Sequence, residues 1–324
     1  MVDIDFVRTL RPEWVQKPVK IRNFREILGE FSGLSNENFL VEDDGKLYKV
    51  RIPGRNTDFF SDRDGEVNDL RTLESTDLIW GHGESNPVGV IPGVIDYKKD
   101  SKIAIFAYIP GVSAKKEDFK RSEIRERFFK TVKRLNECGV ELYRKYNIFN
   151  ELDKYMNRIR TYGDEIIRDY PMQKILRFIE TTKNEVRKVP LPPVPCHNDF
   201  VCDNVILRDN SAALIDWEYG GMADPRHEIA DFLVEQAEPS HSPCPMSEQE
   251  EDHILEIVFG KEKDRHKRIV DCYKFTSNLQ WALWSVIQFH MSAIKFDFEP
   301  YGRGFFDAAL EVVEMLKQRY SLPF

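Results

Sequence analysis

The sequence is poor in cysteine and holds no closely spaced cysteine pair. Structural zinc sites bring cysteines in pairs a few residues apart, and disulfide frameworks belong to small, cysteine-rich secreted domains. Neither pattern occurs, so we expect reduced thiols in a cytosolic protein. The five cysteines are scattered along the 324 residues, at Cys138, Cys196, Cys202, Cys244 and Cys272.

Long apolar runs and an excess of basic residues are also missing. No run approaches the ~20 apolar residues of a membrane helix, and the first residues lack a signal-peptide pattern. The formal net charge is -8 and the pI is about 5.6. The missing apolar run argues against membrane insertion, and the acidic balance argues against a nucleic-acid partner and against a dedicated binder of anionic membranes. An acidic protein that holds phosphates needs local cations or metal ions.

Short runs rich in branched and aromatic residues fill the first third of the chain. Residues 24–51 contain three such runs separated by turn-forming segments, and two more runs precede Tyr108. Residues 62–75 show helical spacing of apolar positions, and the chain beyond residue 111 is mostly helical. We therefore expect an α+β fold with a small antiparallel, β-rich N-terminal lobe (1–108) and a larger, mostly helical C-terminal lobe (109–324).

The pattern that points to chemistry is His197-x-Asp199-x-x-x-x-Asn204, followed by Asp216 after the next expected strand. Phosphoryl transfer needs a carboxylate to orient the attacking hydroxyl, and oxygen ligands that hold Mg²⁺ on the phosphates. Each residue alone would also suit a turn. The loop, a hairpin around Asp209 and the second aspartate nevertheless occur in the right order, which favours a phosphotransferase site.

The same residues resemble a known family. The H-x-D-x-x-x-x-N spacing is similar to the catalytic loop of kinase-like phosphotransferases, and Asp216-Trp217-Glu218-Tyr219 resembles the metal-binding segment of choline and ethanolamine kinases. The resemblance implies a protein-kinase-like fold that binds ATP and Mg²⁺. It also implies that Asp199 is the base, that Asn204 and Asp216 are metal ligands, that Glu218 helps with a second ion, and that His197 braces the loop.

The N-terminal region agrees with this resemblance. The turn that covers the ATP phosphates in this family resembles Ser32-Gly33-Leu34-Ser35-Asn36, although Ser32 stands where the family often has glycine. Period-2 alternation places Lys49 and Arg51 on one face, and the resemblance assigns the phosphate-binding role to Arg51. Glu66 either pairs with Arg51 or is an exposed carboxylate in the first turn of a helix. The segment from Ala107 to Ile109 is expected to contact adenine through its backbone.

A tryptophan pair suggests the acceptor. Trp281, Trp284 and Gln288 share one helix face, which on periodicity alone favours packing in the core. The segment also resembles the tryptophan-bearing helix of choline kinases, in which aromatic faces hold a cationic head group. The resemblance extends to Tyr219, Glu235, Phe298 and Tyr301. Phe298 stands where the family tends to show tyrosine, so the substrate preference stays open.

These resemblances together imply an enzyme that moves the γ-phosphate of ATP to the hydroxyl of a small amino alcohol. Choline is the favoured acceptor and ethanolamine the alternative, with a homodimer as a possible assembly. An aminoglycoside, methylthioribose or another small alcohol is a second reading, because the catalytic loop is shared across these kinases. A nucleotide-binding pseudoenzyme that acts as a scaffold is a third, and it would be favoured by a missing catalytic residue.

Overall fold

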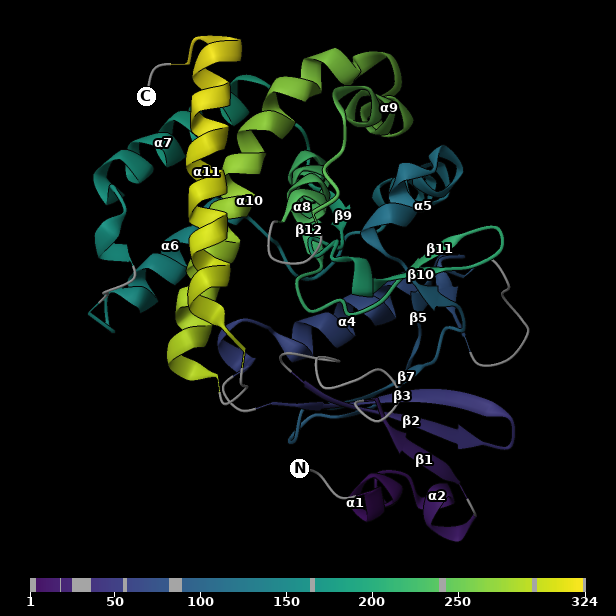
Figure 1. Cartoon of the computed structure of the whole chain (residues 1–324). Helices are drawn as coiled ribbons and strands as arrows, with labels where there is room; N and C mark the ends of the chain where they lie inside the picture. Colours follow the sequence, from purple (N-terminus) through teal and green to yellow (C-terminus); the bar gives the residue numbers. More distant parts are fainter. Residues whose placement is uncertain are drawn as a thin grey trace.

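The computed structural model describes residues 4–17, 19–24, 36–54, 57–81, 89–163, 167–238, 243–292 and 296–322. An antiparallel sheet forms one lobe and long helices form the other, with helix α4 (Arg63–Leu73) between them (Figure 1). The expected α+β fold with two lobes is confirmed. No described helix combines the length and the apolar character that crossing a bilayer requires.

Five strands form the sheet, and every neighbouring pair is antiparallel. Their order is β1 (Lys20–Asn23), β2 (Asn36–Asp43), β3 (Lys46–Pro53), β7 (Ile103–Ala107) and β6 (Val94–Lys98). Asp43 pairs with Lys46 across a two-residue turn. Asp44 and Gly45 in this turn have φ values of 48° and 76°. An Asp-Gly pair suits this geometry because both positions need positive φ.

Alternation along β3 sends its side chains to two different faces. Tyr48 and Val50 pack in a small core with Trp14, which lies on α2 (Pro12–Gln16) beside α1 (Ile4–Thr9). The ring centroids of Trp14 and Tyr48 are 5.5 Å apart. Lys49 and Arg51, which alternate with Tyr48 and Val50 along β3, lie on the opposite face, and the Arg51 side chain donates to Glu66 on α4. The period of two therefore places Lys49 and Arg51 on the face that looks toward the second lobe.

Within the described part of the C-terminal lobe, seven longer helices form its body. They are α5 (Ser122–Asn136), α6 (Ile148–Ile159), α7 (Met172–Lys188), α8 (Pro225–Ala237), α9 (Glu248–Phe259), α10 (Lys263–Met291) and α11 (Phe298–Tyr320). Helix α10 is buried between Ile269 and Gln288 except at the partly buried Lys274, as expected of a central helix. Helix α11 lies along it (Figure 1).

Short strands and turns complete the two lobes. The hairpin of β10 (Val205–Leu207) and β11 (Ala212–Leu214) turns at Asp209-Asn210, as predicted. The remaining strands are β4 (Ile79–Trp80), β5 (Ile91–Pro92), β8 (Val112–Ser113), β9 (Val194–Cys196) and β12 (Gly221–Ala223). The 3-10 turns are η1 (Thr57–Phe59), η2 (Lys116–Lys120), η3 (Ile167–Asp169), η4 (Cys202–Asn204) and η5 (Gly260–Glu262).

Candidate active site

Buried side chains hold the loop from His197 to Asn204 in place. The His197 ring is fully buried, and its Nε2 lies 2.9 Å from the carbonyl oxygen of Ile215. Burial lowers the pKa of His197 to about 4, so the ring is neutral at pH 7. The Glu228 carboxylate of α8 accepts hydrogen bonds from the backbone N–H groups of His197 and Asn198. Glu228 was not predicted from the sequence.

Asp199 and Asn204 are in direct contact. The Asn204 amide donates to Oδ2 of Asp199 at 2.8 Å and to its carbonyl oxygen at 3.1 Å. Among the described residues, Asp199 Oδ1 has no hydrogen-bond partner. Burial, followed by the charge of Asp231 and of other nearby carboxylates, raises the pKa of Asp199 well above its usual value. A carboxylate with a raised pKa and a free oxygen is suited to accept a proton.

Asp216 follows β11 and lies opposite β3. Its backbone has a φ of 65°, and its Oδ1 lies 3.1 Å from Arg51 Nη1. Burial would raise the pKa of Asp216, but the cations of Lys49, Arg51 and Arg63 outweigh it and hold the pKa at about 2. Asp216 is therefore ionised at pH 7 and offers carboxylate oxygens at the boundary between the lobes. The backbone N–H of Ile215 also donates to the Asn204 carbonyl, which joins the hairpin to the loop.

Arg51 and Glu66 form a buried bidentate ion pair between β3 and α4. Their contacts are 2.7 Å and 2.5 Å, and each side chain is 1% exposed. The alternative of an exposed Glu66 is therefore wrong. The helix dipole would also have favoured an exposed position, but here the carboxylate turns inward because Arg51 compensates its charge. Lys49 shares the face of Arg51 but is only partly buried.

Arg63 was missed at the sequence level, although it lies three residues before Glu66 on the same helix. It donates to the Asn36 side-chain oxygen at 2.8 Å and forms ion pairs with Glu66 at 3.5 Å and Glu218 at 2.8 Å. Burial raises the pKa of Glu218, and the Arg63 charge opposes this shift. The i, i+3 spacing of Arg63 and Glu66 was the available signal. Glu218 is thus already paired with a cation.

The nucleotide-binding residues predicted from resemblance are only partly described. Gly33, Leu34 and Ser35 lie outside the described residues, whereas Asn36 is buried at the start of β2. Ala107 ends β7, and its N–H donates to the Gly93 carbonyl at 2.9 Å. Ile109 is buried just beyond it. Any adenine contact by Ala107 would therefore use its carbonyl group rather than its N–H.

Aromatic side chains from several elements surround the two tryptophans of α10. The ring centroids of Trp281 and Trp284 are 5.9 Å apart at 77°, so the rings meet edge to face. Tyr219 lies 6.1 Å from Trp281, and Phe298 lies 5.8 Å from Trp284. The side chain of Tyr301 contacts Phe296 and Phe305 nearby. Gln288, one turn beyond Trp284, is buried as well.

Glu235 is a buried carboxylate of the same region. It is 7% exposed, and its Oε1 has no hydrogen-bond partner among the described residues. Burial and the nearby Asp231 raise the pKa of Glu235 to about 8, while Lys116 acts in the opposite direction. An additional positive charge placed against Glu235 would stabilise its ionised form.

Phe60 and Tyr155 extend the aromatic group and were not predicted. The Phe60 ring lies 6.2 Å from Trp284 and 5.7 Å from Tyr155. Phe60 precedes α4, so the N-terminal lobe contributes directly to this aromatic group. No periodic pattern marks the Phe59-Phe60 pair, and its position depends on packing between the lobes.

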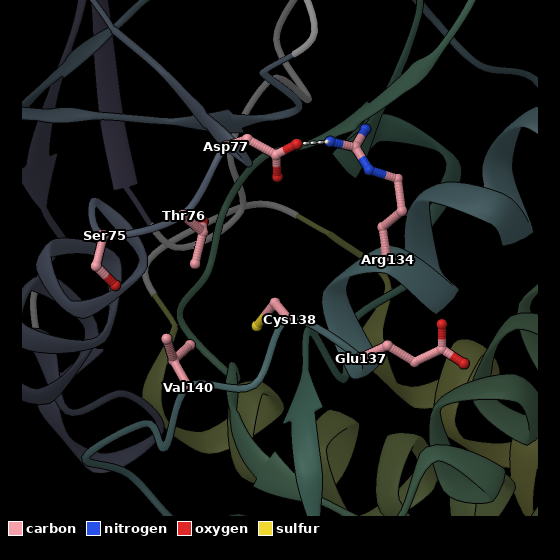
Figure 2. Close-up of a pocket in the computed structure, with 7 residues that line it drawn as sticks. All are labelled: Ser75, Thr76, Asp77, Arg134, Glu137, Cys138 and Val140. Carbon is pink, nitrogen blue, oxygen red and sulfur yellow. Dashed lines mark hydrogen bonds and ion pairs between the residues drawn. The ribbon is translucent and has the colours of Figure 1, made fainter.

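A separate open pocket lies where α4 and α5 end (Figure 2). Its volume is about 450 Å³, and an ion pair of 3.1 Å joins Asp77 to Arg134 at its rim. None of the predicted site residues lines it, so it lies apart from the chemistry described above. The lining residues are Ser75, Thr76, Asp77, Arg134, Glu137, Cys138 and Val140.

Comparison with known proteins gives consistent matches. The family model described as choline/ethanolamine kinase matches residues 104–309. Ethanolamine kinase 2 of Mus musculus is 23% identical over 314 residues, which cover 91% of this chain and 76% of that protein. A choline/ethanolamine kinase family protein from Mesorhizobium loti superposes with a TM-score of 0.74 at 22% identity, covering 96% and 94% of the two chains.

Two further solved structures show the same fold with nucleotides. LicA in complex with AMP has a TM-score of 0.74 at 19% identity, covering 96% of this chain and 98% of that one. An ADP-bound aminoglycoside phosphotransferase has a lower TM-score of 0.59 at 19% identity, covering 97% and 99%. The fold is therefore shared by kinases whose alcohol acceptors differ widely.

Proposed function

Because this chain belongs to the choline/ethanolamine kinase family, we propose that it transfers the γ-phosphate of ATP to the hydroxyl of choline. The family match agrees with the resemblance seen in the motifs, and it makes the chain a phosphotransferase that acts on an alcohol. The observation that carries the choice of acceptor is the aromatic group around Trp281 and Trp284, beside the buried Glu235.

The phosphates are proposed to lie between β3 and the His197–Asn204 loop. The ionised Asp216 and the side-chain oxygen of Asn204 are hard ligands of the kind that Mg²⁺ prefers. The low pKa of Asp216, about 2, fits this role because the carboxylate is charged at every working pH. Bound Mg²⁺ would offset negative charge on the phosphates. Glu218 is proposed as an additional ligand, although its pairing with Arg63 competes with that role.

No group of three or more His, Cys, Asp and Glu side chains gathers as a metal site within the described ranges. A Mg²⁺ ion in this chain would be held by Asp216 and Asn204 together with phosphate oxygens. Arg51 on β3 is proposed to offset further negative charge on the phosphates. We place the boundary between the two lobes at residues 108 and 109.

On the acceptor side, the cationic head group is proposed to lie against Trp281, Trp284 and the rings near Tyr301. Glu235 would supply the opposing charge. The hydroxyl then faces Asp199, whose Oδ1 accepts the proton as the new oxygen–phosphorus bond forms and the β–γ phosphoanhydride bond breaks. Asn204 holds the other Asp199 oxygen, which keeps Oδ1 aimed at the hydroxyl.

The test is a comparison of acceptors in one assay of ADP release, with the product identified by ³¹P NMR. We expect turnover with choline and ethanolamine, with the larger kcat/KM for choline, because a quaternary ammonium presents an apolar surface to the rings. A larger value for ethanolamine would reverse the assigned preference. Turnover with kanamycin but not with choline or ethanolamine would make an aminoglycoside the acceptor in place of an amino alcohol. Binding of ATP without turnover of any acceptor would indicate a scaffold.

The proposed activity also implies the partners, the cellular location and the assembly of the enzyme. The partners are the small acceptor and ATP, with neither nucleic acid nor a membrane needed. We place the enzyme in the cytosol, where ATP is supplied and the scattered cysteines stay reduced. A homodimer is compatible with this activity, and size-exclusion chromatography with light scattering would determine the assembly.

A further inference from the structure

Asp231 is a fully buried carboxylate on α8 that the proposed mechanism does not use. It is 0% exposed, and both of its oxygens accept hydrogen bonds. Oδ1 accepts from the Ser277 hydroxyl at 2.7 Å and from the Trp281 indole N–H at 2.9 Å. Oδ2 accepts from the backbone N–H of Phe200 at 3.3 Å. A buried carboxylate needs such partners to offset its lost hydration.

The three donors belong to two different parts of the site. Phe200 directly follows Asp199, so its N–H belongs to the loop that carries the proposed base. Ser277 and Trp281 are one turn apart on α10, and Trp281 is a wall of the aromatic group. The two Asp231 oxygens therefore connect the loop to the acceptor pocket across a single side chain.

A carboxylate suits this bridge better than other side chains of similar size. Asparagine has one acceptor oxygen, and its NH₂ group would face a donor on the opposite side. Leucine would leave three buried donors without a partner, which is costly in a dry core. Hydrogen bonds to a charged acceptor are also stronger than neutral ones, so both ends of the bridge are held firmly.

We propose that Asp231 is a positioning residue that holds the Asp199 loop and the Trp281 wall in a fixed relation. This inference rests on the proposed function, because the two ends matter together only if an acceptor spans from Trp281 to Asp199. Asp231 acts through its neighbours: it sets the Trp281 ring orientation at one end and the path of the loop backbone at the other. Removing the bridge misplaces the acceptor hydroxyl relative to the base.

The kinetic test compares two variants, one at the acceptor and one at a donor of the bridge. Asp231→Asn should lower kcat/KM for the acceptor by about ten- to a hundredfold, the usual range for a lost hydrogen bond to a charged group. The KM for ATP should stay within about twofold, because the Arg51–Asp216 and Asn204–Asp199 contacts do not involve Asp231. Ser277→Ala removes one donor and should give a smaller loss, about three- to tenfold.

The matched control is Asp271→Asn. Asp271 is also a buried aspartate with several partners, but those partners are Arg319, Tyr320 and Lys274, away from the loop. This variant should lose stability without changing either kinetic constant. Equal kinetic losses in D231N and D271N would reduce Asp231 to a general structural residue and overturn the proposal.

A second readout needs no turnover and therefore separates this inference from the proposed function. In protein labelled with ¹⁵N-phenylalanine, the Phe200 amide peak is the one lost in F200L. Ser277→Ala should shift this peak when Asp231 is present and shift it much less in D231N. Equal shifts of the Phe200 peak in the wild-type protein and in D231N would contradict the proposal that Asp231 couples the loop to α10. A wild-type enzyme without turnover, in contrast, would overturn only the proposed function, and the amide shifts would still decide the bridge.

Discussion

The two halves of the site treat charge in opposite ways. On the phosphate half, Arg51 pairs with Glu66 and Asp216, and Arg63 pairs with Glu218, so anions and cations alternate. On the acceptor half, Asp199 and Glu235 each have a buried oxygen without a hydrogen-bond partner among the described residues. Their pKa values are raised, chiefly by burial and then by neighbouring carboxylates.

This difference suggests what each half is built to receive. The phosphate half holds Asp216 ionised beside the cations of Lys49, Arg51 and Arg63, and its pKa of about 2 reflects those cations. The acceptor half has carboxylates whose charge is only partly balanced, with Lys116 as a nearby cation. A cationic substrate would complete that balance, whereas a neutral alcohol would leave it incomplete.

The largest effect is expected at Asp199. Asp199→Asn removes the proton acceptor, so kcat should fall by on the order of a thousandfold, within the usual contribution of a positioned base. Calorimetry should show nearly unchanged nucleotide binding. Asp203→Asn is the matched control, because Asp203 is an exposed aspartate of the same loop. Full activity of D199N would remove Asp199 from the mechanism.

The next largest effect concerns the ion pair of the phosphate half. Arg51→Met removes the bidentate partner of the buried Glu66 and leaves it only the Arg63 contact at 3.5 Å, which should lower the free energy of unfolding by about 3–5 kcal/mol. The double variant R51M/E66M should recover much of this stability, because a hydrophobic pair can replace a buried ion pair. It should not recover ATP affinity. Restored ATP binding in the double variant would show that Arg51 is purely structural.

Removing one ring from the aromatic group should have a smaller effect, on the KM for choline. Trp284→Ala removes a cation–π contact worth ~2 kcal/mol, so the KM for choline should rise by about thirtyfold. The KM for ATP should hardly change. Phe289→Ala on the same helix is the control, because that ring is 50% exposed. Equal KM changes in W284A and F289A would favour the view that Trp284 only packs the core.

The smallest effect is a pH dependence that isolates Glu235. Its pKa is raised to about 8, so the fraction of ionised carboxylate grows as the pH rises through that value. Choline carries the same charge at every pH. Its kcat/KM should therefore increase between pH 7 and pH 9, by up to about tenfold for one group of this pKa. Glu235→Gln should flatten this rise, and an unchanged rise in E235Q would assign it to another group.

The sequence predicted best the parts of the site that lie close together along the chain. The His197–Asn204 loop, the following hairpin and Asp216 occupy one short stretch, so their order was visible without a structure. Period-2 alternation also placed Lys49 and Arg51 on one face correctly. The roles of these residues in phosphate and metal binding stay predictions.

Residues brought in by packing between distant elements could not be found in this way. Asp231 meets Phe200 and Trp281 only because α8, the loop and α10 converge, and Phe60 reaches Trp284 across the two lobes. Neither Asp231 nor Phe60 lies in a local sequence pattern. A buried residue with distant partners cannot be told from an ordinary aspartate or phenylalanine in the sequence. Arg63 had a partial signal in its helical spacing to Glu66.

The measurement that tests this account most directly compares the binding of choline with that of 3,3-dimethylbutan-1-ol, its uncharged isostere, by calorimetry. Both molecules fill the same volume, so only the charge differs. We expect choline to bind at least about tenfold more tightly than the uncharged alcohol, and Glu235→Gln to reduce this difference in affinity, as for a partly buried charge pair. Equal affinities in the wild-type enzyme would contradict an acceptor half that requires a cation.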